Sequence, residues 1–160
     1  MARYCRYVLM LVIMNSVKPI VKDLMKSAGF RCKNNTWHRQ CNDLIQALNI
    51  QKSAWGELYY INLCFNYYDG SFLFPSEYKF LNTFDMCIRA STFFPNDDFK
   101  SLDFENDYDS EIRTNTIRGI ISKCIDLFNH CNSSYVLKTD YMNICRNRVR
   151  IGPLRDKILG

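Results

Sequence analysis

The sequence predicts an α+β domain, in which an antiparallel sheet meander has an N-terminal helix and C-terminal helices packed on one face. Two stretches, residues 16–28 and 111–129, repeat apolar side chains with the spacing of a single helix face. Between them, several short runs alternate apolar and polar residues and are separated by short turns, a pattern typical of an antiparallel meander. Helices before and after a run of strands indicate the α+β class.

The first helix is expected over residues 16–28. Ser16 is placed to cap its start, Pro19 fits the first turn, and Gly29 marks its end. The apolar side chains recur at intervals of three and one, so they lie on one face; they are Val17, Ile20, Val21, Leu24, Met25 and Ala28.

The strands are expected to follow in order along the chain. FRCKNNTWHRQ predicts a hairpin, because Asn34 and Asn35 tolerate the positive φ of a type I′ turn. Three longer strands are expected in DLIQALNIQK (43–52), ELYYINLCFNYY (57–68) and TFDMCIRASTFF (83–94), where apolar and polar side chains alternate.

The second half of the chain is expected to be helical after an acidic, irregular loop. A weaker helix over 138–149 should follow the helix at 111–129, and Gly152-Pro153 should end it and leave a basic tail. The length suits a single domain. We divide residues 1–160 into a short N-terminal extension (1–14), a helix plus antiparallel sheet (15–94), an acidic loop (95–110) and C-terminal helices (111–160).

The N-terminal extension resembles the front of a signal peptide, because Arg3 and Arg6 precede an apolar run. The run is short, lacks a cleavage site, and is too short to span a bilayer. We therefore interpret it as an extension before Met14, and expect no membrane partner and a cytoplasmic location.

The cysteines indicate reduced thiols rather than a metal site or a disulfide framework. None of the eight is spaced C-x-x-C, and the two histidines are not at finger-like offsets from a cysteine pair. Cys64 and Cys87 fall in apolar runs, where a free thiol behaves as a small hydrophobic side chain. We expect no metal and no cofactor.

Part of the sequence resembles a bacterial family of domains of unknown function, number 4304. The residues that carry the likeness are the first helix ending in AGF, the hairpin NNTWHRQ, the stretch NIQKSAWGELYYINL and the later CIRA. The resemblance covers about residues 16–94. It implies a small intracellular α+β domain and carries no established activity.

The stretch QKSAWGELYYINLCF predicts a corner between two strands and the first candidate site. Gln51, Lys52 and Ser53 offer donors to a carboxylate, phosphate or peptide, and Gly56 permits positive φ beside the ring of Trp55. The alternative is structural: Trp55 folds over the sheet edge and Ser53 bonds its own turn.

A second candidate site needs four side chains to share one sheet face. Arg39, Asn62 and Arg89 would form a basic groove with Gln51, and guanidinium groups hold carboxylate or phosphate with two hydrogen bonds. The alternative is a solvated face with cross-strand pairs to aspartates.

The acidic run is the third candidate surface. Residues 95–111 hold seven acidic residues and one lysine, and the acids that alternate are Asp103, Glu105, Asp107, Asp109 and Glu111. The positions required for an EF-hand are not met. The alternative role is to place negative charge before a helix, with Asp107 or Asp109 as its cap.

The leading functional hypothesis is a protein-binding module, with an immunity or antitoxin protein as one form, whose acidic run binds a basic partner. A nucleic-acid-binding protein that uses Arg39, Arg89 and the basic segment after residue 145 is the second. A small-ligand or enzyme site at the Gln51–Trp55 corner is the third. An enzyme is the less favoured class, because no phosphate loop, H-E-x-x-H or G-x-S-x-G motif is present and no catalytic residue can be named.

Overall fold

A five-stranded antiparallel sheet lies at the centre of the computed structural model, which describes residues 17–70, 84–150 and 152–160. Each strand pairs with the next one along the chain, so the expected meander is confirmed. The strands are β1 (Arg31–Lys33), β2 (Thr36–Cys41), β3 (Leu44–Lys52), β4 (Tyr59–Tyr67) and β5 (Met86–Arg89). Our interpretation of residues 1–14, and of Ser16 as a cap, falls outside the described residues.

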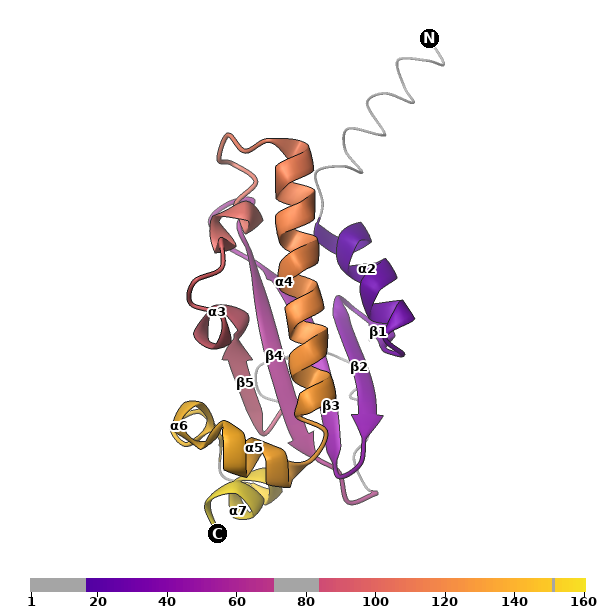
Figure 1. Cartoon of the computed structure of the whole chain (residues 1–160), viewed down its shortest axis with the longest axis vertical. Coiled ribbons are helices and arrows are strands. Elements are labelled where there is room, and N and C mark those ends of the chain that lie inside the picture. Colours follow the sequence, from indigo (N-terminus) through magenta and orange to yellow (C-terminus); the bar gives the residue numbers. More distant parts are fainter. Residues whose placement is uncertain (1–16, 71–83, 151) are drawn as a thin grey trace.

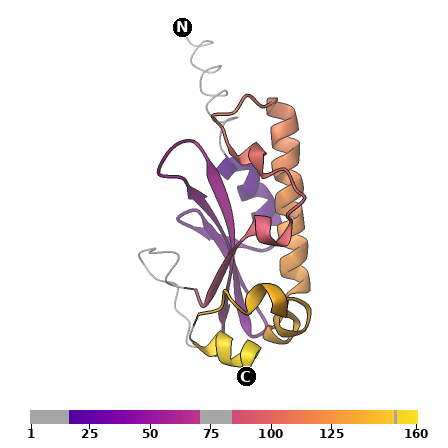
Figure 2. The same cartoon turned by 90° about the vertical axis from the view of Figure 1, so that its left-hand side faces the viewer.

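Two helices, α2 (Val17–Ser27) and α4 (Ser110–His130), cover one face of the sheet, and α4 runs along its length (Figures 1 and 2). The shorter helices are α3 (Ala90–Phe93), the 3-10 helix η2 (Phe99–Leu102), α5 (Ser134–Asp140), α6 (Met142–Cys145) and α7 (Pro153–Leu159). Figure 1 shows the last three grouped at the end of the sheet where α4 ends. The predicted α+β class is therefore confirmed.

The main hydrophobic core lies between the sheet and these two long helices. Val17, Val21 and Met25 of α2 are fully buried, as the apolar spacing predicts. Buried side chains of the sheet and α4 meet them, among them Leu48, Ile61, Leu63, Phe65, Ile117, Ile121, Cys124 and Phe128. Each such side chain contributes about 1.5–3 kcal/mol by leaving water, so this layer supplies most of the stability.

The first turns form as their sequence predicts. Asn34 and Asn35 have φ values of 47° and 61° between β1 and β2. Gly29, at φ 82°, ends α2. The amides of Gly29 and Phe30 donate hydrogen bonds back to the last turn of the helix, Gly29 N to the carbonyl of Lys26 and Phe30 N to that of Met25. This is a Schellman motif, which satisfies carbonyls that a helix end leaves open.

A buried amide joins the sheet to the end of α4. Gln46 of β3 is fully buried, and its Nε2 donates to the carbonyls of Phe128 and Cys131, each at 2.7 Å. Its Oε1 accepts from Nε of Arg39 at 2.8 Å. Arg39 in turn donates to the carbonyl of Ala28, just after α2. We call Gln46, Arg39 and the groups they bind the Gln46 clasp.

Two boundaries differ from our predictions. The strand expected over residues 83–94 is β5, which ends at Arg89, because Ala90 begins a helical turn in which Phe94 N donates to the carbonyl of Ala90. The helix expected over 138–149 is instead two short helices, α5 and α6, and residues 146–149 lie outside both. Helix α5 starts earlier than expected because Ser133 caps it. The expected basic tail is α7, since Pro153 suits a first helical turn.

The prediction that Cys64 and Cys87 are free thiols is wrong. They lie directly opposite each other on β4 and β5, with their Cα atoms 4.1 Å apart, and they form a disulfide. Their separation of 23 residues gave no indication of this pairing. The free cysteines among the described residues are Cys32, Cys41, Cys124, Cys131 and Cys145.

Among the helices that the structure describes, none combines the length and apolar character needed to cross a bilayer. A cytoplasmic location stays a prediction. It was based in part on the expectation that the cysteines are reduced, and the Cys64–Cys87 disulfide weakens that basis.

The Gln46 clasp yields a stability prediction. Gln46→Leu keeps the side-chain volume but leaves two buried carbonyls and the Nε of Arg39 without their partner. We expect a loss of about 2–4 kcal/mol in the free energy of unfolding, measured by urea denaturation. The control is Asn129→Ala, which removes only the exposed bond from Arg39 to Asn129 Oδ1 and should cost less than about 1 kcal/mol. Equal losses in the two variants would contradict the role of Gln46.

Candidate functional site

The second candidate site is divided between the two faces of the sheet. Asn62 of β4 pairs with Arg89 of β5. Tyr60, two residues before Asn62 on β4, pairs with Gln51 of β3. Since side chains alternate along a strand, these four side chains share one face of the sheet. Arg39 pairs with Gln46, which belongs to the opposite, helix-covered face. The predicted grouping of Arg39 with Gln51, Asn62 and Arg89 is therefore wrong.

Arg39 has a structural role on the helix-covered side of the sheet, where it is partly buried. Its guanidinium donates to Gln46, Ala28 and Asn129 and lies 4.5 Å from the ring centre of Phe30. Burial lowers the pKa of this guanidinium. With these bonds made inside the molecule, Arg39 is not available to a ligand on the other face.

Arg89 has no such bonds. Its guanidinium carbon lies 3.8 Å from the ring centre of Tyr60, and its Nη1 is buried without a hydrogen-bond partner among the described residues. Its strand neighbour Asn62 donates instead to Asn49 Oδ1 at 3.2 Å and to Gln51 Oε1 at 3.3 Å. Burial lowers the pKa of Arg89. Arg89 is thus a half-buried cation that lacks an acceptor.

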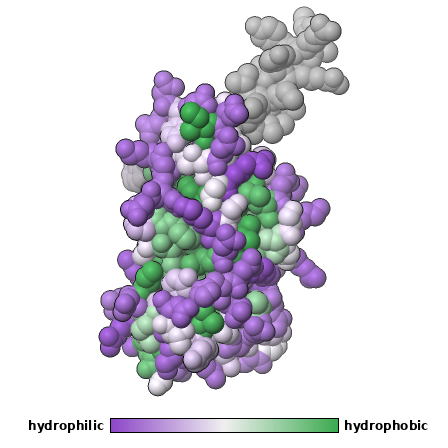
Figure 3. Space-filling view, viewed as in Figure 1, coloured by the Kyte–Doolittle hydropathy of each residue, from purple (hydrophilic) through white to green (hydrophobic). Residues whose placement is uncertain are grey.

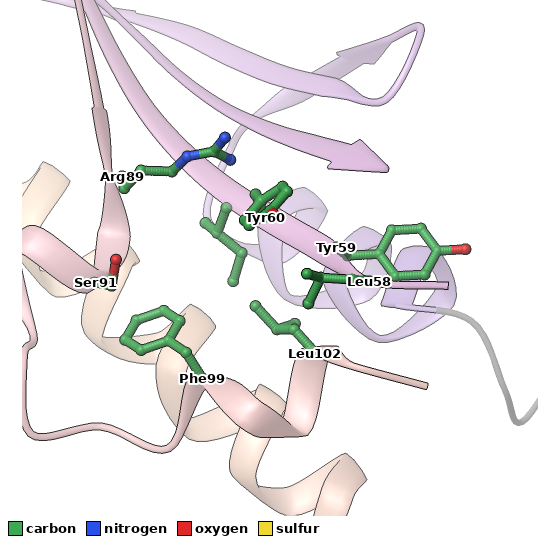
Figure 4. Close-up of a pocket in the computed structure, with 8 residues that line it drawn as sticks. Leu58, Tyr59, Tyr60, Arg89, Ser91, Phe99 and Leu102 are labelled. Atoms are coloured by element: carbon green, nitrogen blue, oxygen red, sulfur yellow. The ribbon is translucent and has the colours of Figure 1, made fainter. Parts of the chain in front are cut away.

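A pocket of about 150 Å³ lies beside this arginine (Figure 4). Figure 4 shows Arg89 reaching from β5 toward Tyr60 on β4, with Leu102 of η2 facing Leu58 across the gap. The residues that line the pocket are Leu58, Tyr59, Tyr60, Ile61, Arg89, Ser91, Phe99 and Leu102. Its wall is mainly apolar, with one cation.

The Gln51–Trp55 corner is a well-ordered hairpin connection. Ser53 N donates to the carbonyl of Leu58 at 2.7 Å, and Ser53 Oγ accepts from Trp55 N at 3.1 Å. Trp55 is 95% exposed, so the alternative in which its ring folds over the sheet edge is wrong. Gln51 points to the sheet face opposite the long helices, so the corner residues do not converge on one pocket.

The corner contacts the acidic segment. Lys52 forms an ion pair with Glu57, whose other carboxylate oxygen accepts from the hydroxyl of Tyr59. Glu57 N donates to Glu105 Oε1 at 3.3 Å, and the backbone carbonyl of Glu57 accepts from Phe104 N. Gly56 does not use the positive φ that a glycine permits. A Cβ at Gly56 would lie 2.6 Å from Glu105 Oε1, so a larger residue there would require the Glu105 carboxylate to move.

Several acidic side chains of the segment accept hydrogen bonds from the segment's own backbone and from the start of α4. Asp109 caps α4 by accepting from Glu111 N and Ile112 N, as one of our interpretations predicted. Asp103 accepts from Glu105 N and from the side-chain amide of Asn106. Asp107 is exposed and makes no hydrogen bond or ion pair with the residues that the structure describes. The segment therefore contains both structural carboxylates and an open one.

The basic segment after residue 145 lies at the opposite end of β5 from Arg89. The carbonyl of Asp85 accepts from Arg150 N, and Val149 forms a bridge with Met86 at the start of this strand. The basic side chains there are exposed; they are Arg146, Arg148, Arg150, Arg155 and Lys157. They do not form one surface with Arg39, whose guanidinium faces the helices.

Sequence reasoning missed Tyr60 and the contact of Glu57 with Glu105. Tyr60 has the same parity as Asn62 in β4, so strand alternation was a signal that could have found it. The contact of the corner with Glu105 spans 48 residues of chain, and no local pattern indicates it.

Three buried thiols have an unreactive environment. Burial raises the pKa of Cys131 and Cys145 to about 12 and also raises that of Cys124. Since the thiolate is the reactive form, these groups are poor nucleophiles at neutral pH. The described residues contain no cluster of three or more side chains that could hold a metal ion.

The thiols give a labelling prediction. When the native chain is treated with iodoacetamide at neutral pH and mapped by mass spectrometry, exposed Cys32 should be modified first, while Cys124, Cys131 and Cys145 should stay unmodified. All four should react at similar rates after unfolding in guanidinium chloride. Equal rates for Cys131 and Cys32 in the folded chain would contradict the burial.

The acidic segment gives a second prediction. Asp109→Ala removes an N-cap and should lower the free energy of unfolding by about 1 kcal/mol. Asp107→Ala changes an exposed side chain and should alter it by less than about 0.5 kcal/mol. Urea denaturation of both variants separates the structural carboxylate from the open one. A larger loss for Asp107→Ala would show that we have assigned the two roles wrongly.

The comparisons with known proteins identify a family but carry no activity. No curated protein and no solved structure matches the chain significantly. One family model, described as "Domain of unknown function (DUF4304)", matches residues 21–137. The match is longer than the resemblance seen in the sequence, because it continues through α4 to α5. Since it covers more than half of the chain, this protein belongs to the DUF4304 family.

Proposed function

We propose that this chain is a protein-binding module whose contact surface is the tip of the β3–β4 hairpin together with the neighbouring acidic segment. The observation that carries the proposal is Trp55, which is 95% exposed at the hairpin tip. Tryptophan is enriched among the residues that dominate binding energy at protein interfaces. Its ring buries about 150–250 Å² when a partner covers it.

The hairpin holds Trp55 in an ordered setting. The turn is closed by the bond from Ser53 N to the carbonyl of Leu58, and Ser53 Oγ accepts from the backbone of Trp55. The base of the turn is tied to the acidic segment through Glu57 and Glu105. An anchor on a rigid support loses less conformational entropy when it binds, which favours affinity.

The charge around this anchor indicates a basic partner. Glu105, Asp107 and Glu111 are exposed, and Ile112 in the first turn of α4 is 59% exposed. The hairpin tip and this segment lie toward the end of the molecule where α4 begins (Figures 1 and 2). Figure 3 shows that this end is largely hydrophilic, with a small hydrophobic surface over the first part of α4.

The partner that fits is a protein with an apolar pocket for one aromatic ring and basic residues around it. Opposite charges of this kind speed association and select among partners. An immunity protein that neutralises a basic intracellular toxin is one concrete form of this function. Two features support the general proposal: the exposed ring and the carboxylates that the fold does not use.

The test is a quantitative pull-down from the native cells with the tagged full-length chain, at low and moderate salt. Trp55→Ala should weaken capture of the stoichiometric partner by about 30-fold, because loss of a central aromatic anchor costs about 2 kcal/mol or more. Thermal stability should not change, since the ring touches little of the fold. Glu105→Gln combined with Asp107→Asn should weaken capture mainly at low salt.

The matched control is Tyr135→Ala. Tyr135 is a 72% exposed aromatic residue on α5, at the other end of the molecule, so its loss should leave capture unchanged. A partner that Trp55→Ala retains, or that Tyr135→Ala loses, would contradict the proposed surface. Capture of nucleic acid that is released by salt would support the nucleic-acid hypothesis instead.

A further inference from the structure

Among the described residues, the edge of β4 has a short interval without a neighbouring strand. β5 pairs with β4 from Phe65 to Asn62 and ends at Arg89, where the chain turns into α3. The next contact along the same edge is the bridge between Leu58 and Asp103. Within the described part of the chain, Tyr59, Tyr60 and Ile61 therefore pair only with β3, and the pocket beside Arg89 lies at this interval.

The length and closed ends of this interval indicate which kind of ligand could bind there, a peptide strand or a small molecule. An added peptide strand needs a continuous open edge. Here the edge is closed at one end by the Asn62–Arg89 pair and at the other by the Leu58–Asp103 bridge, which leaves three residues. The pocket holds about 150 Å³, a volume close to that of an engineered cavity known to bind benzene. A small molecule fits this space and a peptide strand does not.

The lining indicates the chemistry of such a molecule. Ile61, Phe99 and Leu102 supply apolar wall, so the body of the ligand should be apolar. Arg89 supplies a guanidinium that stacks on Tyr60 and has a buried Nη1 without an acceptor. A buried donor without an acceptor is unfavourable, and a carboxylate is the planar acceptor that matches a guanidinium best.

We propose that this pocket, which we call the Arg89 pocket, binds a small monocarboxylate whose apolar body is about the size of a benzene ring. The carboxylate pairs with the guanidinium of Arg89, and the apolar body lies against Phe99 and Leu102. A phosphate is a poorer fit, because a doubly charged group would meet one cation and a mainly apolar wall. The pocket does not include Trp55, so this site is separate from the proposed protein-binding surface.

The experiment is an NMR titration of the isotope-labelled full-length chain with sodium benzoate at constant ionic strength. Benzamide has nearly the same shape without the charge and serves as the ligand control. Benzoate should cause saturable shifts at residues 58–61, 89–91 and 99–102, and benzamide should bind at least about tenfold more weakly. Equal affinity for the two compounds, or benzoate shifts elsewhere in the chain, would overturn the proposal.

Three substitutions complete the test. Arg89→Met keeps the apolar stem over Tyr60 but removes the charge, and should weaken benzoate binding at least about tenfold. Ser91→Leu keeps the arginine and fills part of the pocket, and should weaken it to a similar extent. Arg118→Met removes an exposed arginine from α4 and should leave the affinity unchanged. Unchanged affinity in both pocket variants, or an equal loss in Arg118→Met, would overturn the proposal.

Trp55→Ala distinguishes this inference from the proposed function. Since Trp55 does not line the Arg89 pocket, this variant should bind benzoate as the parent chain does while it loses the protein partner. Loss of benzoate binding in Trp55→Ala would contradict the separation of the two sites.

Discussion

The position of the long helices on the sheet depends on the buried amide of Gln46. Helix ends leave carbonyls that a dry interior cannot tolerate without donors. Gln46 supplies donors to the carbonyls of Phe128 and Cys131 at the end of α4, and Arg39, held by Gln46, reaches the carbonyl after α2. Apolar burial supplies most of the free energy but is not directional. The Gln46 clasp therefore fixes the ends of the two helices relative to the sheet.

The same interaction explains why the two arginines of the sheet have different roles. Side chains alternate between the faces of a strand, and the strand pairing places Arg39 with Gln46 under the helices and Arg89 with Asn62 on the other face. Arg39 is used by the fold. Arg89 makes a ring contact but no hydrogen bond with the described residues, and it borders a pocket. A cation that the fold does not neutralise is the better candidate for a ligand.

The acidic segment serves the fold and leaves part of its charge to solvent. Asp109 and Asp103 satisfy nearby backbone amides and a side-chain amide, and Glu105 fastens the segment to the hairpin corner. These contacts join the hairpin corner, which carries the exposed ring of Trp55, to the acidic segment, which carries the open carboxylate of Asp107. Two features that are far apart in the chain can thus form one surface.

Local patterns in the sequence determined the class of the fold, the order of the strands, the Asn34-Asn35 turn and the two long helices, because periodicity and turn chemistry act over a few residues. They also predicted that Asp107 or Asp109 would cap α4, and the structure assigns the cap to Asp109. Only the tertiary structure decided that Arg39 and Arg89 lie on opposite faces, that Cys64 meets Cys87, and that Glu105 rests on Gly56. These facts depend on strand pairing and on contacts between segments that are distant in the chain, and local sequence patterns do not indicate either.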